Sequence, residues 1–262
     1  MGRIMVVTSG KGGVGKSTVT ASLGASFAKA GRRTLLIDMD MGLRSLDVML
    51  GLEDKVVYDL ADVADGMCRI KQALLQHGTM ENLFLLAAAQ QRGSDALSTR
   101  DCEKVLDMLR DRFDEILIDC PAGAGRGFRN AVTGADDAIL VETPDVIALR
   151  DAQRMVGLIG RMDIARPQLI LNRVLPRHMA KDAPLDPRLY AERLGIPLLG
   201  IVPEDEDVPL SCAKGEPAAL GASPSGKALE RVARRLMGED VPLVPVTRPG
   251  LFARLRRALR SS

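Results

Sequence analysis

The sequence predicts an α/β fold, in which helices flank a mainly parallel β-sheet and an amphipathic helix follows at the C-terminus. Two observations lead to this class. Apolar strand-like runs alternate along the chain with runs of helical period, which is the pattern of repeated β-α-β units. The chain has 262 residues, of which 46% are hydrophobic, enough for one core of ordinary size. We therefore expect one main domain over residues 1–240.

The expected elements follow in order from the N-terminus. The expected strands are short runs rich in Val, Ile and Leu: Ile4–Thr8, Thr34–Asp38, Asn82–Ala87, Glu115–Asp119, Ala138–Glu142, Gln168–Asn172 and Leu198–Pro203. The expected helices are Ser17–Ala30, which is closed by Gly31, and three segments of helical pattern, Arg100–Arg112, Ala148–Met162 and Ser225–Met237. Parallel strands bind ligands at their carboxyl ends, so we expect the functional site at that edge of the sheet.

Charge and cysteine content argue against several classes of protein. The formal net charge is +2, which is too small to drive binding to nucleic acid, and no specific nucleic acid is expected. The cysteines have no C-x-x-C pair, which favours reduced thiols over a disulfide framework or a zinc site. No signal peptide is evident, and no apolar run reaches the roughly 18 residues of a spanning helix. We therefore expect a cytoplasmic protein. The cysteines are Cys68, Cys102, Cys120 and Cys212.

A glycine-rich segment lies between the first expected strand and the first expected helix. It satisfies the phosphate-loop pattern G-x-x-x-x-G-K-S/T, in which inward-facing backbone N–H groups and a helix N-terminus bind phosphate. In this pattern Lys16 reaches the β- and γ-phosphates, and the Ser17 hydroxyl is a ligand of Mg²⁺. The predicted cofactors are therefore ATP and Mg²⁺. The predicted nucleotide-binding residues are Gly10, Lys11, Gly12, Gly13, Val14, Gly15, Lys16, Ser17 and Thr18.

A second lysine in this loop, Lys11, is not required by the general pattern. The run K-G-G-V-G-K-S resembles the deviant Walker A signature of the ParA/MinD superfamily of ATPases. The resemblance implies that Lys11 reaches the phosphates of a partner subunit, and hence that ATP binding produces a homodimer. It also implies an ATPase that is slow alone and accelerated by a partner, with Lys11 and Lys16 among its catalytic residues.

Two expected strands end in acidic residues that complete this site. Glu115–Asp119 is an apolar run closed by an acid, which is the Walker B arrangement and predicts that Asp119 holds Mg²⁺ or its water. Thr34–Asp38 ends in the same way, and Asp40 projects to the same side because strands have a period of two. The resemblance assigns Asp40 to orientation of the attacking water and Asp38 to support of the metal.

The adenine end of the site is assigned by resemblance. The superfamily places an asparagine at a strand end near the base, which matches Asn172, and a strand followed by Pro-Glu-Asp, which matches Pro203 and Asp205. An asparagine in a loop is also a common turn former, so that interpretation remains open for Asn172.

Further residues distinguish the branches of the superfamily. The segments Met41–Asp47 and Val57–Leu60 resemble the MinD family, which positions the cell-division septum, and the resemblance covers nearly the whole chain. It implies MinC- and MinE-like regulators, which would contact the helix predicted over Ala148–Met162 through Arg150, Asp151 and Arg154. One departure is that Ala124–Gly127 follows Pro121-Ala122-Gly123, where an Ile-Glu pair is usual. Another is Ser45, which replaces an asparagine.

Other branches remain as alternatives. A partition ATPase would present a basic DNA-binding face, to which Arg231, Arg234 and Arg235 could contribute, although such spacing usually marks a solvated helix face. A flagellar-placement ATPase is a second alternative. An iron–sulfur protein related to the nitrogenase iron protein is disfavoured, because Cys102 lies in a predicted helix and Cys120 directly follows Asp119.

The C-terminal segment differs in composition from the rest. Residues 241–249 predict an extended linker because they contain three prolines, and residues 250–262 predict an amphipathic helix. Arginines on one face and large apolar residues on the other are typical of a helix that lies in an anionic membrane surface. The alternative is a helix docked on the core. We expect a protein reversibly peripheral on the inner face of the cell membrane, with Leu251, Phe252, Leu255 and Leu259 as its apolar contacts.

Overall fold

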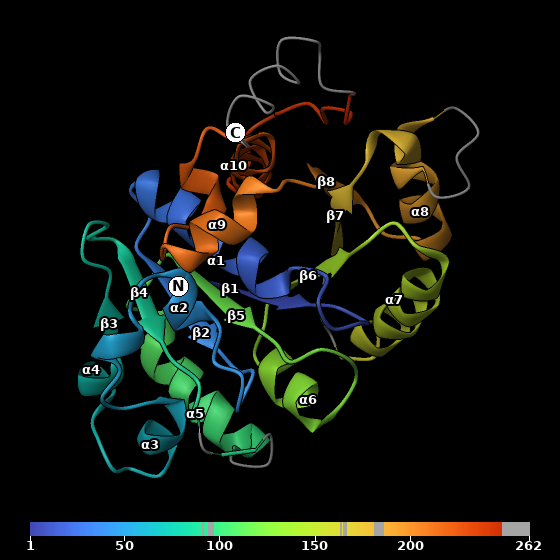
Figure 1. The fold of residues 1–262 in the computed structure, drawn as a ribbon. Coiled ribbons are helices and arrows are strands. Elements are labelled where there is room, and N and C mark those ends of the chain that lie inside the picture. Colours follow the sequence, from blue (N-terminus) through green and yellow to red (C-terminus); the bar gives the residue numbers. More distant parts are fainter. Residues whose placement is uncertain (91, 94–96, 163, 165–166, 181–185, 248–262) are drawn as a thin grey trace.

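The computed structural model describes residues 1–90, 92–93, 97–162, 164, 167–180 and 186–247. Within these ranges the protein has one eight-stranded sheet in the order β3-β4-β2-β5-β1-β6-β7-β8, with helices on both faces (Figure 1). Every neighbouring pair is parallel except β3 with β4. The predicted α/β class and mainly parallel sheet are confirmed, while the helix predicted over residues 250–262 lies outside the described residues.

The strands follow the apolar runs of the sequence. Their bounds are β1 Arg3–Thr8, β2 Thr34–Asp38, β3 Leu75–Gln76, β4 Leu83–Leu86, β5 Glu115–Asp119, β6 Asp137–Glu142, β7 Gln168–Val174 and β8 Leu198–Pro203. Helices and single-turn helices (η) join them: α1 Lys16–Lys29, α2 Leu46–Met49, η1 Glu53–Lys55, α3 Leu60–Ala64, α4 Ile70–Ala73, α5 Thr99–Arg110, α6 Arg126–Val132, α7 Val146–Ile159, η2 Pro176–Met179, α8 Pro187–Leu194, α9 Asp207–Ala213, η3 Ala218–Leu220 and α10 Pro224–Leu236. None of these helices is long and apolar enough to cross a membrane.

The sheet separates two hydrophobic cores. Ile4 and Val6 of β1 pack with α5, α6, α7 and α8 on one face, whereas Met5 and Val7 pack with α1 and α10 on the other. This alternation is the period of two expected of a strand that is buried on both sides. The two strands that end at Asp38 and Asp119 are enclosed on both faces, because all five residues of β2 and all five of β5 are buried.

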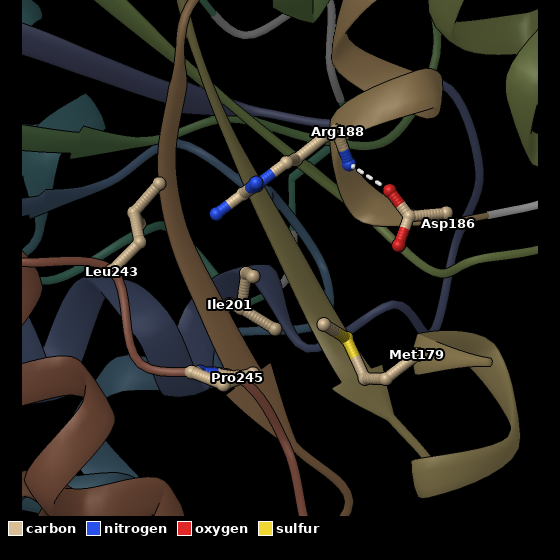
Figure 2. A pocket seen from close by; sticks show the side chains of 6 residues that line it. All are labelled: Met179, Asp186, Arg188, Ile201, Leu243 and Pro245. Carbon is tan, nitrogen blue, oxygen red and sulfur yellow. Dashed lines mark hydrogen bonds between the residues drawn. The ribbon is translucent and has the colours of Figure 1, made fainter. Parts of the chain in front are cut away.

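The predicted linker is partly held against this domain. Residues 241–247 form neither helix nor strand, and their role as a linker stays a prediction. The Arg235 guanidinium of α10 donates hydrogen bonds to the carbonyl oxygens of Val241 and Pro242, at 2.7 and 2.9 Å, and to that of Leu199 in the edge strand β8 at 2.7 Å. Figure 2 shows Leu243 and Pro245 of this segment at a pocket of about 290 Å³ that Ile201 also lines. The segment thus covers part of the sheet edge.

Candidate functional site

The glycine-rich loop occupies residues 9–15, between β1 and α1 at the carboxyl edge of the sheet. Gly15 caps α1 in the left-handed conformation at φ 94°. A Cβ at this position would lie 2.3 Å from Nδ2 of Asn172, so the close approach of β7 to the loop requires glycine. The first turn of α1 contains no acidic residue, and its N–H groups can bind an anion. The loop therefore has the geometry of a phosphate site.

Lys16 and Asp119 form the charged centre of this site. Lys16 is only 8% exposed, and its Nζ lies 3.8 Å from Oδ1 of Asp119. Burial raises the pKa of Asp119, whereas the Lys16 charge and a hydrogen bond with the Ser17 hydroxyl oppose that rise. Oδ2 of Asp119 is buried without a hydrogen-bond partner among the described residues. Because Mg²⁺ prefers oxygen ligands, this open carboxylate oxygen beside the Ser17 hydroxyl fits a magnesium site.

Asp38 lies beside Asp119 in a different environment. Its Oδ1 accepts the N–H of Asp40 at 2.9 Å, and its Oδ2 accepts those of Ser45 and Leu46 at 3.0 and 3.1 Å. Burial and the Asp119 charge raise the pKa of Asp38 to about 7, against the effect of these three hydrogen bonds. The carboxylate therefore holds the loop that follows β2, and direct metal contact by Asp38 stays a prediction.

Asp40 is carried by this loop and is half-buried. Burial raises the pKa of its carboxyl group, and the nearby Lys16 charge opposes the rise. Asp40 is thus brought to the same edge as Lys16, as the sequence predicts, through a loop that Asp38 orders. Its role in orienting the attacking water stays a prediction.

The residues predicted to contact adenine have contacts within the protein. Asn172 is buried and donates from Nδ2 to the carbonyl oxygen of Val14 at 2.8 Å, so it holds the phosphate loop. Pro203 ends β8. The carboxylate of Asp205 accepts hydrogen bonds from Asp207 N–H and from the N–H and hydroxyl of Ser225, which fixes the starts of α9 and α10. Contact of Asn172, Pro203 and Asp205 with a base remains a prediction.

Sequence reasoning missed one residue at this edge, Glu142. It ends β6, it is fully buried, and its Oε1 accepts the N–H of Gly10 at 2.6 Å. The signal was present, because an apolar strand closed by an acid is also the pattern that identified Asp119. Lys11, the next residue after Gly10, is exposed, and its contact with a partner subunit stays a prediction.

The described residues contain no group of three or more His, Cys, Asp or Glu side chains that could hold a metal ion. Contact of Ser17 and Asp119 with Mg²⁺ stays a prediction, in which these side chains bind the ion together with phosphate oxygens. All four cysteines are free, and Cys102 and Cys120 are buried.

Comparison with known proteins identifies the family. The family described as "CobQ/CobB/MinD/ParA nucleotide binding domain" matches residues 5–218. The septum site-determining protein MinD of Synechocystis sp. is 44% identical over 263 residues, which cover 99% of this chain and 99% of that protein. The chain belongs to the MinD family.

Two solved structures agree with this assignment to the MinD family. MinD in the MinC:MinD cell division protein complex of Aquifex aeolicus is 37% identical with a TM-score of 0.86, and the match covers 95% of this chain and 100% of that chain. MinD of Pyrococcus horikoshii complexed with Mg-ADP is 29% identical with a TM-score of 0.80, over 92% of this chain and 100% of that chain. The predicted family of septum-placing, nucleotide-binding ATPases is confirmed, the expected cofactors ATP and Mg²⁺ fit it, and the partition and flagellar alternatives are not favoured.

Proposed function

We propose that the protein is an ATP-dependent switch in placement of the division septum, which dimerises with Mg-ATP and returns to a monomer after hydrolysis. The observation that carries the proposal is the centre formed by Lys16, Ser17 and Asp119, where a buried carboxylate oxygen lacks a partner in the described chain beside a phosphate loop. The exposed Lys11 next to this centre supports dimerisation.

Each residue has a distinct part in the proposed reaction. The loop N–H groups and Lys16 bind the phosphates, and Ser17 and Asp119 would hold Mg²⁺, which would neutralise phosphate charge. Asp40 orients the attacking water. Because phosphoryl transfer depends on positioning and charge, a second copy that contributes Lys11 would complete the site.

Dimerisation is tested by two substitutions with opposite expected results. Lys11→Ala should give a monomer that still binds ATP, because it removes only the cation offered to a second copy. Asp40→Ala should give a persistent ATP-bound dimer, because hydrolysis is blocked after association. Light scattering distinguishes the two states, and Lys29→Ala, at the exposed end of α1, is the control. Identical oligomeric states for Lys11→Ala and Asp40→Ala in ATP would refute the assigned roles.

The regulators that we propose are MinC- and MinE-like proteins, and their proposed contact surface is α7. The MinC:MinD complex of Aquifex aeolicus supports the first of these. Arg150 and Arg154 of α7 are exposed, whereas Asp151 is half-buried against the phosphate loop. We therefore expect Arg150→Glu to weaken binding of a MinC-like partner in calorimetry and to leave ATP affinity unchanged. Undiminished partner binding would contradict the proposed surface.

Reversible membrane contact through residues 250–262 is also a proposal. It is supported by the basic and apolar faces of that segment and by the anchored linker before it. Leu255→Glu should abolish ATP-dependent sedimentation with anionic vesicles and leave the melting temperature unchanged, because the charge interrupts only the lipid-facing side. A lowered melting temperature with unchanged sedimentation would instead show a helix docked on the core.

A further inference from the structure

Glu142 is a buried carboxyl group that the proposed ATP cycle does not use. It is 0% exposed at the end of β6, and its Oε1 accepts the Gly10 N–H at 2.6 Å. Its Oε2 is also buried, with no hydrogen-bond partner among the residues that the structure describes. Oε1 thus holds Gly10, the residue immediately before Lys11, while Oε2 has no partner in the described chain. A buried polar atom without a partner is costly, so a functional explanation is warranted.

The hold on Gly10 is reinforced by close packing against α7. A Cβ on Gly10 would lie 2.6 Å from Cβ of Asp151 and 2.7 Å from its carbonyl carbon. The loop therefore has no room to shift toward α7. Glu142 and α7 together fix Gly10, which directly precedes Lys11. These contacts therefore restrain any movement of Lys11 toward a second molecule.

Charged and polar groups from three neighbouring segments face Glu142. Burial raises its pKa to about 8, Asp151 of α7 and Asp145 before α7 act in the same direction, and Lys11 opposes them. Tyr190 of α8 faces the same carboxyl group, and its hydroxyl is likewise buried without a partner in the described chain. The positive charge of Lys11 lowers the pKa of Glu142 and of Asp145. Departure of Lys11 removes this stabilisation of the two charged carboxylates, while the hydrogen bonds of Asp145 to Ala148 and Thr143 and of Glu142 to Gly10 remain.

We propose that Glu142 is a positioning residue that couples movement of Lys11 toward a second copy of the chain to uptake of one proton at Oε2. The inference rests on the proposed ATP-dependent dimer. The proton comes from solvent and replaces the positive charge that Lys11 takes away, so the net charge around Glu142 is unchanged. The protonated carboxyl keeps Oε1 as the acceptor for Gly10 and gains an O–H donor at Oε2. Dimerisation is therefore favoured by protonation of Glu142.

The pH dependence of dimerisation tests this coupling. The association constant of the dimer formed with a non-hydrolysable ATP analogue is measured between pH ~6.5 and ~9.5 by analytical ultracentrifugation. For the unchanged protein we expect it to fall as pH rises through about 8, by up to about tenfold per pH unit for each protomer. Glu142→Gln, which imitates the protonated carboxyl, should keep a nearly constant association constant over this range.

A matched control separates Glu142 from other titrating groups. Glu115 is also a buried carboxyl with an oxygen that has no partner among the described residues. It differs from Glu142 because it lies at the amino end of its strand, β5, away from the phosphate loop, and pairs with Arg32. Glu115→Gln should therefore retain the pH dependence of the unchanged protein. If Glu142→Gln retains it too, the coupling is refuted and the dimerisation proposal stands. Absence of an analogue-induced dimer at every pH would overturn both.

A direct measurement on the unchanged protein avoids any effect of substitution on folding. At a pH slightly above the pKa of Glu142, dimerisation induced by the analogue in weakly buffered solution should consume protons, and calorimetry in buffers of different ionisation enthalpy should give the same uptake. Monomeric Lys11→Ala corrects for protons exchanged on nucleotide binding itself. No difference in proton uptake between the two proteins would refute the inference.

Discussion

Strands β2 and β5 are neighbours in the sheet, and each ends in a buried aspartate that lies level with the other, Asp38 opposite Asp119. Their surroundings differ. The carboxylate of Asp38 accepts three backbone N–H groups, from Asp40, Ser45 and Leu46. Asp119 instead faces Lys16 and keeps one oxygen without a partner in the described chain. Asp38 and Asp119 both close an apolar strand, yet their carboxylates have different structural roles.

The cause lies in the segments that follow the strands. After β2 the chain turns back and presents its N–H groups to Asp38. After β5 the Cys120 N–H bonds to the carbonyl oxygen of Val7, and Pro121 has no N–H to donate. Within the described chain these two residues leave Asp119 without a backbone cap, so its oxygen stays open to a metal. A strand-end acid therefore predicts the edge of the site, whereas the next few residues decide whether the acid is a ligand or a structural support.

The sharpest test of this contrast is Asp119→Asn. It removes the charge that would hold Mg²⁺, so we expect Mg²⁺-dependent ATP affinity and hydrolysis to fall by roughly 100-fold. No backbone N–H group loses its acceptor in this variant, in contrast to Asp38→Asn, so any fall in the melting temperature comes from the loss of the Lys16 partner. Calorimetry with and without a chelator and a thermal melt measure the two effects. Retained Mg²⁺ dependence would show that Asp119 is not part of the metal site.

Asp38→Asn should give the opposite pattern. An amide in this position presents an N–H₂ group to backbone donors and leaves at least one of them without an acceptor, at a cost of about 1–3 kcal/mol. That corresponds to a lower melting temperature by about 2–4 °C per kcal/mol. We expect ATP affinity to keep its dependence on Mg²⁺. A loss of that dependence without a loss of stability would instead make Asp38 a metal ligand.

These cases show how much the sequence could predict. The fold was predictable because each central strand is an apolar run and α5, α7 and α10 have helical period over 12 to 14 residues. Helix α1 is buried on nearly every side, and it was predictable from its place between the glycine-rich loop and Gly31. Helices such as α3 and α4, of 5 and 4 residues, are too short for that period to emerge. The phosphate loop was predictable because its glycines and lysines are contiguous, and Asp119 because it closes a buried strand.

Partners that come from distant segments were not predictable. The bond of Asn172 to Val14 joins residues 158 positions apart, and that of Glu142 to Gly10 joins residues 132 apart. Neither pairing is marked by a pattern among neighbouring residues in the sequence. Arg235 likewise resembles one of several solvated arginines on a helix, yet its guanidinium holds the linker to the sheet edge.

Glu142 extends the comparison to a third strand end and gives a pH-dependent effect on stability. Its carboxyl has a folded-state pKa of about 8, raised mainly by burial from an ordinary value of 4.5. The folded state therefore binds the proton more tightly than the unfolded state, and its contribution to stability is lost as pH rises from about 4.5 to 8. The loss is at most about 1.4 kcal/mol per pH unit.

Without nucleotide, the unchanged protein should thus lose stability relative to Glu142→Gln as pH rises, while the two remain similar near the ordinary pKa of a glutamate. Urea unfolding of both proteins across this range measures the difference between their free energies of unfolding. The contributions of groups that titrate in both proteins cancel in this difference. Parallel curves for the two proteins would show that burial does not raise the pKa of Glu142.

The smallest expected effect concerns Thr20, which lies between Lys16 and Asp119. Its hydroxyl donates to the carbonyl oxygen of Lys16 at 3.0 Å and lies 3.4 Å from Oδ1 of Asp119. Thr20→Val keeps the shape and removes the hydroxyl, at a cost of about 0.5–1.5 kcal/mol in the free energy of unfolding. The Thr20 hydroxyl contacts Oδ1 of Asp119 and so helps to orient Oδ2, the oxygen without a partner in the described chain, toward the metal. Loss of this contact should weaken the Mg²⁺ dependence of ATP affinity by a few fold.

Ser26→Ala provides the matched control for Thr20→Val. Ser26 lies on the same helix, and its hydroxyl donates to the carbonyl oxygen of Ser22, also four residues earlier, at 2.8 Å. Its loss should lower stability by a similar amount and leave the Mg²⁺ dependence unchanged, because it removes the same helix bond far from Asp119. Equal effects of the two substitutions on Mg²⁺ dependence would mean that Thr20 acts only through α1. A larger effect of Thr20→Val would show that occupation of Oδ1 helps to keep the free oxygen of Asp119 aimed at the metal.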